Sequence, residues 1–145
     1  MAIPDIGVKT FDPKMVVVTF GTIPISGYAA GTFISVRPSG AAFGKSKGAG
    51  GDVERINRNQ ADYEVSITLQ QTAAVNAELY AALAADQVTN AGVFPLTVKD
   101  LLGKTLFFAA QAWIRQAPDM EESDDLSTRE WVFDTGIATN LVGGN

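Results

Sequence analysis

The chain has 145 residues and contains neither cysteine nor histidine, and this composition excludes several classes of protein. Without cysteine there is no disulfide, thiolate nucleophile or cysteine metal site, and without histidine the commonest general base and metal ligand is missing. The length suits one domain with a single hydrophobic core, so we expect residues 1–145 to form one domain.

The formal net charge of −5 is unevenly distributed along the chain. Residues 1–59 carry seven basic residues against four acidic ones, whereas residues 60–145 carry four against twelve. Such a chain is not expected to wrap nucleic acid, because phosphate neutralisation requires clustered lysine and arginine. It could instead line a channel through which a polyanion passes, and the opposite charges of its two parts suit head-to-tail contact between copies.

No apolar run reaches the roughly 18 residues of a membrane helix, and the N-terminus lacks the basic and apolar regions of a signal peptide. We therefore expect no membrane segment and a chain that stays in the compartment where it is made. Only 19% of the residues are charged, which favours a subunit that hides neutral surface in an assembly.

The N-terminal third is predicted to contain an extended arm followed by three strands. Residues 1–13 include two prolines and one glycine and should form the arm. A β-branched strand should span Met15 to Phe20 and pair, across a glycine, with Thr22 to Tyr28. A third strand should run from Thr32 to Arg37 and end at the following proline.

The segment from Ser39 to Asp52 is predicted to be a long loop that is mobile in the isolated chain. It carries five glycines and two lysines, and Phe43 is almost its only apolar residue. Such a segment cannot offset its own ordering entropy. Val53 to Arg58 should then resume pairing and lead into the next strand.

Part of this loop, Gly40 to Ser46, is similar to a phosphate-binding loop. That motif needs four residues between its glycines, whereas three stand here, and it should open a helix. The glycine-rich residues that follow do not start a helix, so no nucleotide site is predicted.

The clearest hydrophobic patterns begin at Ala61. Apolar and polar residues alternate from Ala61 to Gln70, which predicts a strand with one face in water. Thr72 then stands where a helix N-cap is expected. Spacing by four residues predicts one helix over residues 73–86, with an apolar face formed by Val75, Leu79 and Leu83.

Three further strands and an acidic loop are expected after a turn near Asn90 to Gly92. Phe94 to Val98 leads into the run from Lys104 to Ile114, which is apolar on both faces and should be covered by protein on both sides. Pro118 to Ser127 should form the acidic loop. A closing strand is predicted from Trp131 to Thr139, with a bulge at Gly136.

Together these segments predict about seven strands and one helix. The expected fold class is therefore mainly β, a sandwich or small barrel, with one flanking helix around residues 73–86 that covers one side or one end.

The remaining candidate sites each have a simple structural explanation. The acidic loop lacks the alternating ligands, the glycine and the distal glutamate of a calcium site, so a solvated loop, or a patch that meets basic residues of another copy, is favoured. Its acidic residues are Asp119, Glu121, Glu122, Asp124 and Asp125.

Acid–base chemistry would need two carboxylates close together. The candidates are Glu64 with Glu54, or Asp100 with Asp134, but nothing in their spacing brings any two together. Trp113 and Trp131 are interpreted as core or interface anchors rather than a ligand cage. The sequence thus predicts no catalytic, cofactor or metal residue.

Taken together, the segments resemble the tail tube subunits of contractile-tailed bacteriophages. The resemblance covers most of residues 53–140 and the general layout of the N-terminal strands, and it consists of structural motifs rather than a catalytic signature. It is carried by Tyr63 to Thr72, Val75 to Leu79, Asp86, Phe94 to Asp100, Ala112 to Arg115, and Arg129 to Phe133. Related bacterial secretion tubes and phage-derived bacteriocins share this architecture and stay open as alternatives.

The resemblance implies a non-enzymatic virion protein with a β-sandwich or barrel-like fold, one flanking helix and no cofactor. Copies would form homohexameric rings, and the rings would stack into a helical tube whose lumen conducts viral DNA during ejection without binding it specifically. Its other partners would be the tail sheath, tail terminator and baseplate proteins. Assembly would take place in the cytoplasm of the bacterial host.

The resemblance also suggests which residues make the contacts, by position alone. The arm 1–13 and the loop 39–52 would bridge adjacent rings. Glu64 is the first candidate for a residue facing the lumen, because its strand has a polar face and an acidic lumen would repel DNA. The expected inter-ring residues are Gly40, Phe43, Lys45, Lys47 and Asp52.

The alternative to a tube subunit is a small β-barrel or sandwich module that binds a ligand or another protein, or a different virion component. A closed, deep apolar pocket within one subunit would favour this alternative. An enzyme that uses only carboxylates and lysine is the least favoured interpretation.

Overall fold

The computed structural model describes residues 8–142, so residues 1–7 of the expected N-terminal arm lie outside the described part. Within that part the chain forms ten strands, one α-helix and one short 3-10 helix. In chain order these elements are η1 (Pro13–Met15), β1 (Val16–Phe20), β2 (Ile23–Ile25), β3 (Ile34–Pro38), β4 (Phe43–Lys47), β5 (Val53–Asn57), β6 (Tyr63–Gln70), α1 (Val75–Thr89), β7 (Phe94–Asp100), β8 (Leu106–Gln116), β9 (Thr128–Thr135) and β10 (Ala138–Leu141).

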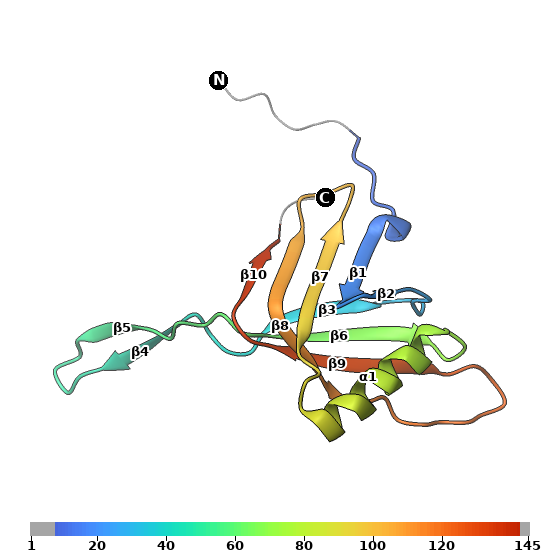
Figure 1. The fold of residues 1–145 in the computed structure, drawn as a ribbon. Coiled ribbons are helices and arrows are strands. Elements are labelled where there is room, and N and C mark those ends of the chain that lie inside the picture. Colours follow the sequence, from blue (N-terminus) through green and yellow to red (C-terminus); the bar gives the residue numbers. More distant parts are fainter. Residues whose placement is uncertain (1–7, 143–145) are drawn as a thin grey trace.

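Eight strands form one antiparallel sheet in the order β2-β1-β7-β8-β9-β6-β3, with β10 paired to β8. The sheet folds over, so that β1, β7, β8 and β10 form one layer and β3, β6 and β9 cross it as a second layer (Figure 1). Strand β8 belongs to both layers, because residues 106–109 pair with β10 and residues 112–116 pair with β9. The expectation of a mainly β fold with one helix is confirmed.

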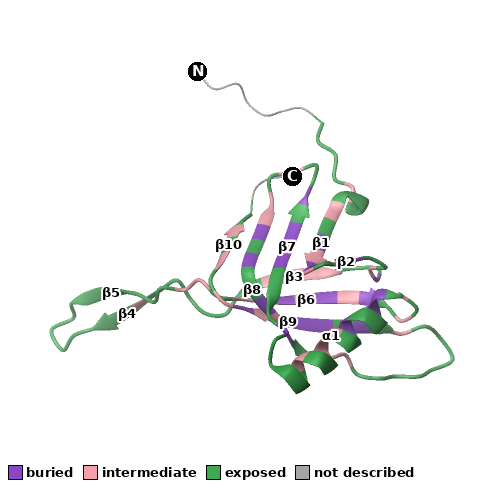
Figure 2. Ribbon diagram, in the orientation of Figure 1, coloured by how far each residue is buried: buried purple, intermediate pink, exposed green. Residues whose placement is uncertain are grey.

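The hydrophobic core lies between the two layers, where buried residues alternate along the strands (Figure 2). The rings of Phe20 and Phe133 meet across it at 5.0 Å between centroids. Full burial of each large apolar side chain stabilises the folded state by roughly 1.5–3 kcal/mol, relative to leaving that side chain exposed. The largest buried side chains are Trp131, Phe20, Phe107, Phe133, Ile67, Leu69, Leu79 and Leu96.

Helix α1 flanks the second layer, but it begins and ends differently from the prediction. Ala74, not Thr72, is the N-cap residue, and no side chain caps it. Instead, Asn76 Nδ2 donates to the carbonyl oxygen of Gln70 at 3.0 Å, which ties the first turn to β6. The helix continues beyond residue 86 to Thr89 and ends at Asn90, which has a left-handed φ of 56°. An asparagine tolerates this conformation well.

The closing strand predicted from Trp131 to Thr139 is two strands, β9 and β10, with Gly136 between them. The break allows the chain to pair first with the C-terminal half of β8 and then with its N-terminal half. The prediction that both faces of β8 are covered is wrong for the single chain. Phe108 is 44% exposed, and Ala110 and Gln111 are exposed as well.

The segment from Ser39 to Asp52 is not a structureless loop. Its residues Phe43–Lys47 form β4, which pairs with β5 in a separate two-stranded sheet, so β5 does not pair with the main sheet as expected. The glycines shape the turn: Gly48 N donates to Asp52 O at 2.8 Å, and Gly51 adopts a φ of 90°, which few other residues tolerate. The high glycine content therefore indicates a tight turn here.

Candidate functional site

Two surface features stand out because the chain itself does not use them for packing. The first is the solvent side of β3, β6, β9 and the C-terminal half of β8, called here the four-strand face. The second is the β4–β5 hairpin, called here the hairpin arm, which projects away from the sandwich (Figure 1).

The four-strand face follows from the alternation along β6. Val65, Ile67 and Leu69 are fully buried in the core, so the intervening Glu64, Ser66 and Thr68 lie on the opposite side. Cross-strand register then sets their neighbours. One row across the face contains Arg37, Glu64, Asp134 and Trp113, and the next contains Ser35, Ser66, Val132 and Gln116.

The charged side chains of the first row form a connected network with Arg115, which lies at the bulge of β8 between Ile114 and Gln116. Arg37 Nη2 lies 2.6 Å from Glu64 Oε1, while Arg115 Nη1 lies 3.3 Å from Glu64 Oε2. The same Arg115 nitrogen lies 3.4 Å from Asp134 Oδ1. The partial burial of Glu64 acts to raise the pKa of its carboxyl, but the hydrogen bonds and charges of Arg115 and Arg37 hold that pKa below its usual value.

The structure places Glu64 on the polar side of its strand, as expected, but not as an isolated negative charge. Two arginines neutralise it, which the sequence did not indicate because Arg115 is 51 residues away along the chain. Glu64 also lies opposite Asp134 on β9, although the sequence spacing did not predict that these two residues are neighbours.

The other proposed carboxylates lie elsewhere. Glu54 is on the hairpin arm, and Asp100 ends β7, where its Oδ1 accepts a hydrogen bond from Leu102 N at 3.0 Å. Glu64 and Asp134 are both engaged by Arg115, so the arrangement resembles an ion-pair network rather than an acid–base pair.

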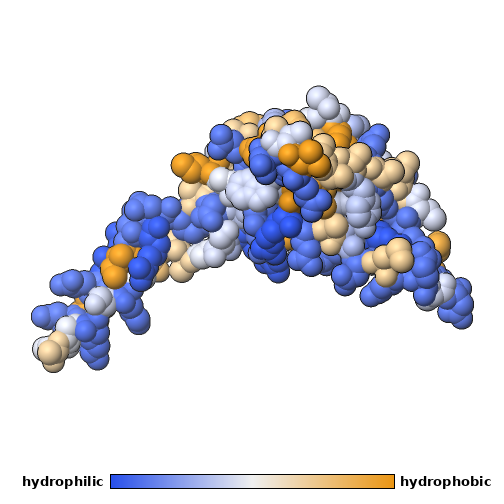
Figure 3. Space-filling model, turned by 60° about the horizontal axis from the view of Figure 1, so that its bottom comes forward, coloured by the Kyte–Doolittle hydropathy of each residue, from blue (hydrophilic) through white to orange (hydrophobic). Residues whose placement is uncertain are grey.

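The hairpin arm has no buried side chain. It extends as a largely hydrophilic projection with a few apolar residues (Figure 3). Phe43 and Val53 are 48% and 65% exposed, and the guanidinium of Arg55 lies 4.4 Å from the centre of the Phe43 ring. Lys45 is directly opposite Arg55, and like charges in this position destabilise a strand pair. An acidic partner would relieve this repulsion.

The residues expected to make inter-ring contacts are all in or beside the hairpin arm. Phe43, Lys45 and Lys47 alternate along β4 and therefore share one side of it, whereas Gly40 precedes β4 and Asp52 lies in the turn before β5.

The connection between β8 and β9, residues 117–127, contains the predicted acidic loop and packs along the helix and the adjacent end of β6. Tyr80 Oη donates to Pro118 O at 3.3 Å, and Gln71 Nε2 donates to Glu122 Oε2 at 3.3 Å. Across residues 8–142, no group of three or more acidic side chains is arranged so that it could hold a metal ion.

Trp131 is a core anchor, as predicted: it is fully buried, and its Nε1 donates to Asn76 Oδ1 at 2.9 Å. Trp113 is half-buried, in the first row of the four-strand face. The described helix is neither long nor apolar enough to cross a membrane.

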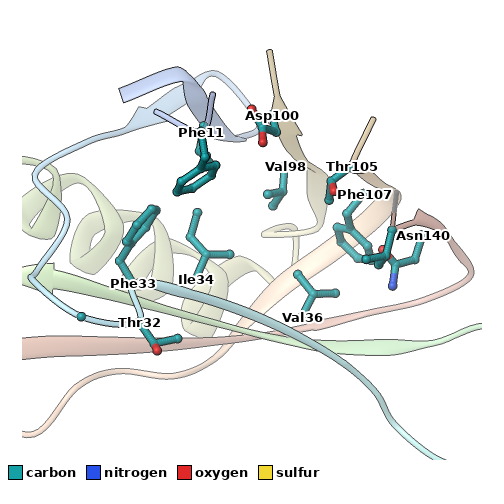
Figure 4. Close-up of a pocket in the computed structure, with 13 residues that line it drawn as sticks. Phe11, Thr32, Phe33, Ile34, Val36, Val98, Asp100, Thr105, Phe107 and Asn140 are labelled. Carbon is teal, nitrogen blue, oxygen red and sulfur yellow. The ribbon is translucent and has the colours of Figure 1, made fainter. Parts of the chain in front are cut away.

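A hollow of about 370 Å³ opens where the two layers separate, between β3 and the strands β1, β7 and β8 (Figure 4). Its lining is mainly apolar and includes Phe11, Phe33 and Phe107, while Asp100 contributes a carboxylate at its rim. Asp100 Oδ2 is buried and has no hydrogen-bond partner among the described residues. The hollow is open to solvent, so it is not the closed pocket that would favour a ligand-binding module.

Comparisons with known proteins agree with this architecture. The structural protein ORF10 of Pseudomonas phage KPP10 is 27% identical over 128 residues, which is 83% of this chain and 71% of that protein. A chain in the cryo-EM structure of the anti-feeding prophage tube-terminating cap matches with a TM-score of 0.63 and 15% identity, over 99% of this chain and 100% of that one.

A further match comes from the sheath–tube complex of the extracellular contractile injection system PVC in its extended state. Its TM-score is 0.61 at 11% identity, over 91% of this chain and 93% of that chain. No protein-family model matches the chain. At such identities the structural matches concern the fold, and they confirm the expected resemblance to tube-type proteins of contractile tails.

Proposed function

We propose that the chain is a non-enzymatic structural subunit of a phage tail tube or of the tube of a related contractile particle. Copies form rings, the rings stack, and the four-strand face lines a lumen that conducts viral DNA. The protein is then a component of the virion that assembles in the host cytoplasm, with the sheath, terminator and baseplate proteins as its other partners. Similarity to a phage structural protein and to a sheath–tube complex supports this assignment.

The observation that carries the proposal is the hairpin arm. Its side chains are almost all exposed, including the apolar Phe43, Val53 and Ile56, so the arm gains almost no stability from its own subunit. A two-stranded hairpin in water is at best marginally stable. Contact with another copy would bury these apolar side chains and complete the structure.

The edges of the main sheet support ring formation. Strands β2 and β3 end the strand order, so each leaves one edge without a partner among the described residues. Free edges promote association, and closure into a barrel removes them. Ring formation would thus satisfy backbone groups that the single subunit leaves exposed.

The charges of the hairpin arm support stacking between rings. Lys45, Lys47 and Arg55 share one side of the arm, whereas the loop 117–127 carries five acidic residues. Opposite charges of this kind steer and orient association. We assign the arm of one copy to the acidic loop of a copy in the next ring.

Negative-stain electron microscopy of the full chain, with sedimentation velocity, tests the proposal. The wild type should form rings or tubes in a concentration-dependent way. Ser39 N lies 3.1 Å from Asp62 O, so a short glycine–serine linker can replace residues 41–58 without moving the rest of the chain. That variant should keep its fold and lose stacking, while the control Lys104→Ala should form tubes. A wild type that stays monomeric at all concentrations contradicts the proposal.

A tube-terminating cap is the second candidate, and the similarity to the anti-feeding prophage cap favours it. A cap completes a tube and does not continue it. In the same experiment, single rings that never elongate would therefore support a cap, and stacked rings would support a tube subunit.

A further inference from the structure

The network on the four-strand face is centred on one carboxylate that binds two arginines. Each oxygen of Glu64 contacts a different guanidinium, one from β3 and one from β8. We propose that Glu64 is a positioning residue that keeps Arg37 and Arg115 from binding the phosphates of a nucleic acid that passes over this face. The inference rests on the proposed function, because it takes the four-strand face as the lining of the channel.

The two arginines are otherwise well suited to bind phosphate. Their side chains are 59% and 43% exposed, and they project from the same face of the sheet. A guanidinium presents a planar fork of donors that matches phosphate oxygens, and such contacts are the strong ones in nucleic-acid binding. Repeated around stacked rings, free arginines would hold DNA in place, which a conducting channel must avoid.

The geometry shows how one acid can prevent this. The 2.6 Å contact to Arg37 and the 3.3 Å contact to Arg115 direct both guanidinium groups toward the middle of the sheet. Asp134 adds a contact to Arg115 alone, at 3.4 Å. Glu64 is therefore the one acid of this network that engages both arginines, and its removal should release Arg37 fully and Arg115 in part.

Glu130 provides a matched control. It lies on the same strand face as Asp134 and pairs in register with Thr68, which is on the same side of β6 as Ser66 and Glu64. Among residues 8–142, no arginine forms an ion pair with it. Glu130→Gln and Glu64→Gln thus remove the same charge from the same face, but only the second releases arginines.

The experiment measures binding of a fluorescently labelled DNA duplex of about 20 base pairs to full-length subunits, by anisotropy over a series of salt concentrations. Protein is kept below the concentration at which rings form. We expect Glu64→Gln to bind about tenfold more tightly than the wild type and Glu130→Gln, with a slope of log K against log salt that is steeper by about 1 to 2. The triple variant Glu64→Gln, Arg37→Gln, Arg115→Gln should return to wild-type binding.

Exposed ion pairs contribute little to the free energy of folding, so these variants should fold. Glu64→Thr also removes the carboxylate and should bind the duplex as tightly as Glu64→Gln. Equal binding by Glu64→Gln and Glu130→Gln would overturn the inference, because charge alone would then explain the change. Wild-type binding as tight as that of Glu64→Gln would overturn it too. Neither result depends on whether tubes form, so failure of the inference is separate from failure of the proposed function.

Discussion

Asn76 and Trp131 join the helix to the sheet through buried hydrogen bonds. Asn76 Nδ2 donates to Gln70 O at 3.0 Å, and Asn76 Oδ1 accepts from Trp131 Nε1 at 2.9 Å. Both residues are buried, so removal of the amide leaves the indole N–H without a partner. A buried donor without a partner destabilises the folded state by more than the net stability that its hydrogen bond had contributed.

Asn76→Ala should therefore lower the free energy of unfolding by about 2–4 kcal/mol, measured by urea denaturation of the unassembled subunit. Gln87→Ala, at an exposed position of the same helix, is the control and should change it by less than about 0.5 kcal/mol. Similar values for the two variants would show that the Asn76 bonds do not anchor the helix.

Tyr28 gives a second test at the scale of one residue, through pH. Its hydroxyl donates to Ile25 O at 2.9 Å, and burial raises the pKa of Tyr28 to about 12. In the unfolded chain a tyrosine has a pKa of about 10. As the pH rises above 10, the unfolded chain loses this proton while the folded one keeps it, so stability present below pH 10 is lost.

The decrease in unfolding free energy between about pH 9 and about pH 11 should be larger for the wild type than for Tyr28→Phe, since the variant has no proton to lose there. Urea denaturation at the two pH values measures both decreases, and the variant corrects for the lysines that titrate in the same range. Equal decreases would mean that Tyr28 ionises normally in the folded subunit.

At the scale of elements, local patterns predicted those strands and the helix whose residues pack against the core. The alternation in β6 and the four-residue spacing of Val75 and Leu79 both reflect burial in the observed structure. Pairing of Val53 to Arg58 was expected, but the hairpin arm itself could not be predicted this way, because none of its side chains is buried and its pairing of Lys47 with Val53 depends on a glycine turn. Thr72 had the right chemistry for a cap, but the contacts of Asn76 start the helix later.

The candidate site was predictable only in part, for a similar reason. The polar side of β6 follows from alternation, so Glu64 could be placed on it from sequence. Its arginine partners could not, because Arg37 and Arg115 reach it through the register of β3 and through the bulge between Ile114 and Gln116 on β8. Such register is a property of the whole sheet and has no local signal.

The free edge of β3 allows a direct test of subunit pairing. Phe33 O accepts a hydrogen bond from Thr68 N at 2.8 Å, so alternate residues of β3 face β6, and Ile34 and Val36 turn their backbone groups to the free edge. Val36→Pro removes one outward N–H, whereas Val36→Thr keeps it with a side chain of similar size.

If β3 pairs with a neighbouring copy, Val36→Pro should raise the concentration needed for assembly by roughly tenfold, while Val36→Thr stays near the wild type. Sedimentation velocity across a concentration series gives these thresholds. Unchanged assembly of the proline variant would exclude this edge of β3 from the subunit interface.

At the scale of the whole molecule, the incomplete parts of the described residues lie at the surface. They include the sheet edges at β2 and β3, the hairpin arm and the exposed side of β8 that carries Phe108. The four-strand face differs from these, because it is polar and its central charges are already paired. This contrast fits a subunit that meets other copies through its edges and arm while its four-strand face stays in contact with solvent.

Cryo-electron microscopy of the assembled wild-type protein, at a resolution that shows side chains, tests this arrangement most directly. We expect stacked rings in which Glu64, Arg37 and Arg115 face the central channel and each hairpin arm contacts a copy in the adjacent ring. Rings in which α1 or the outer side of β7 faces the channel, or in which the arms contact nothing, would contradict the account.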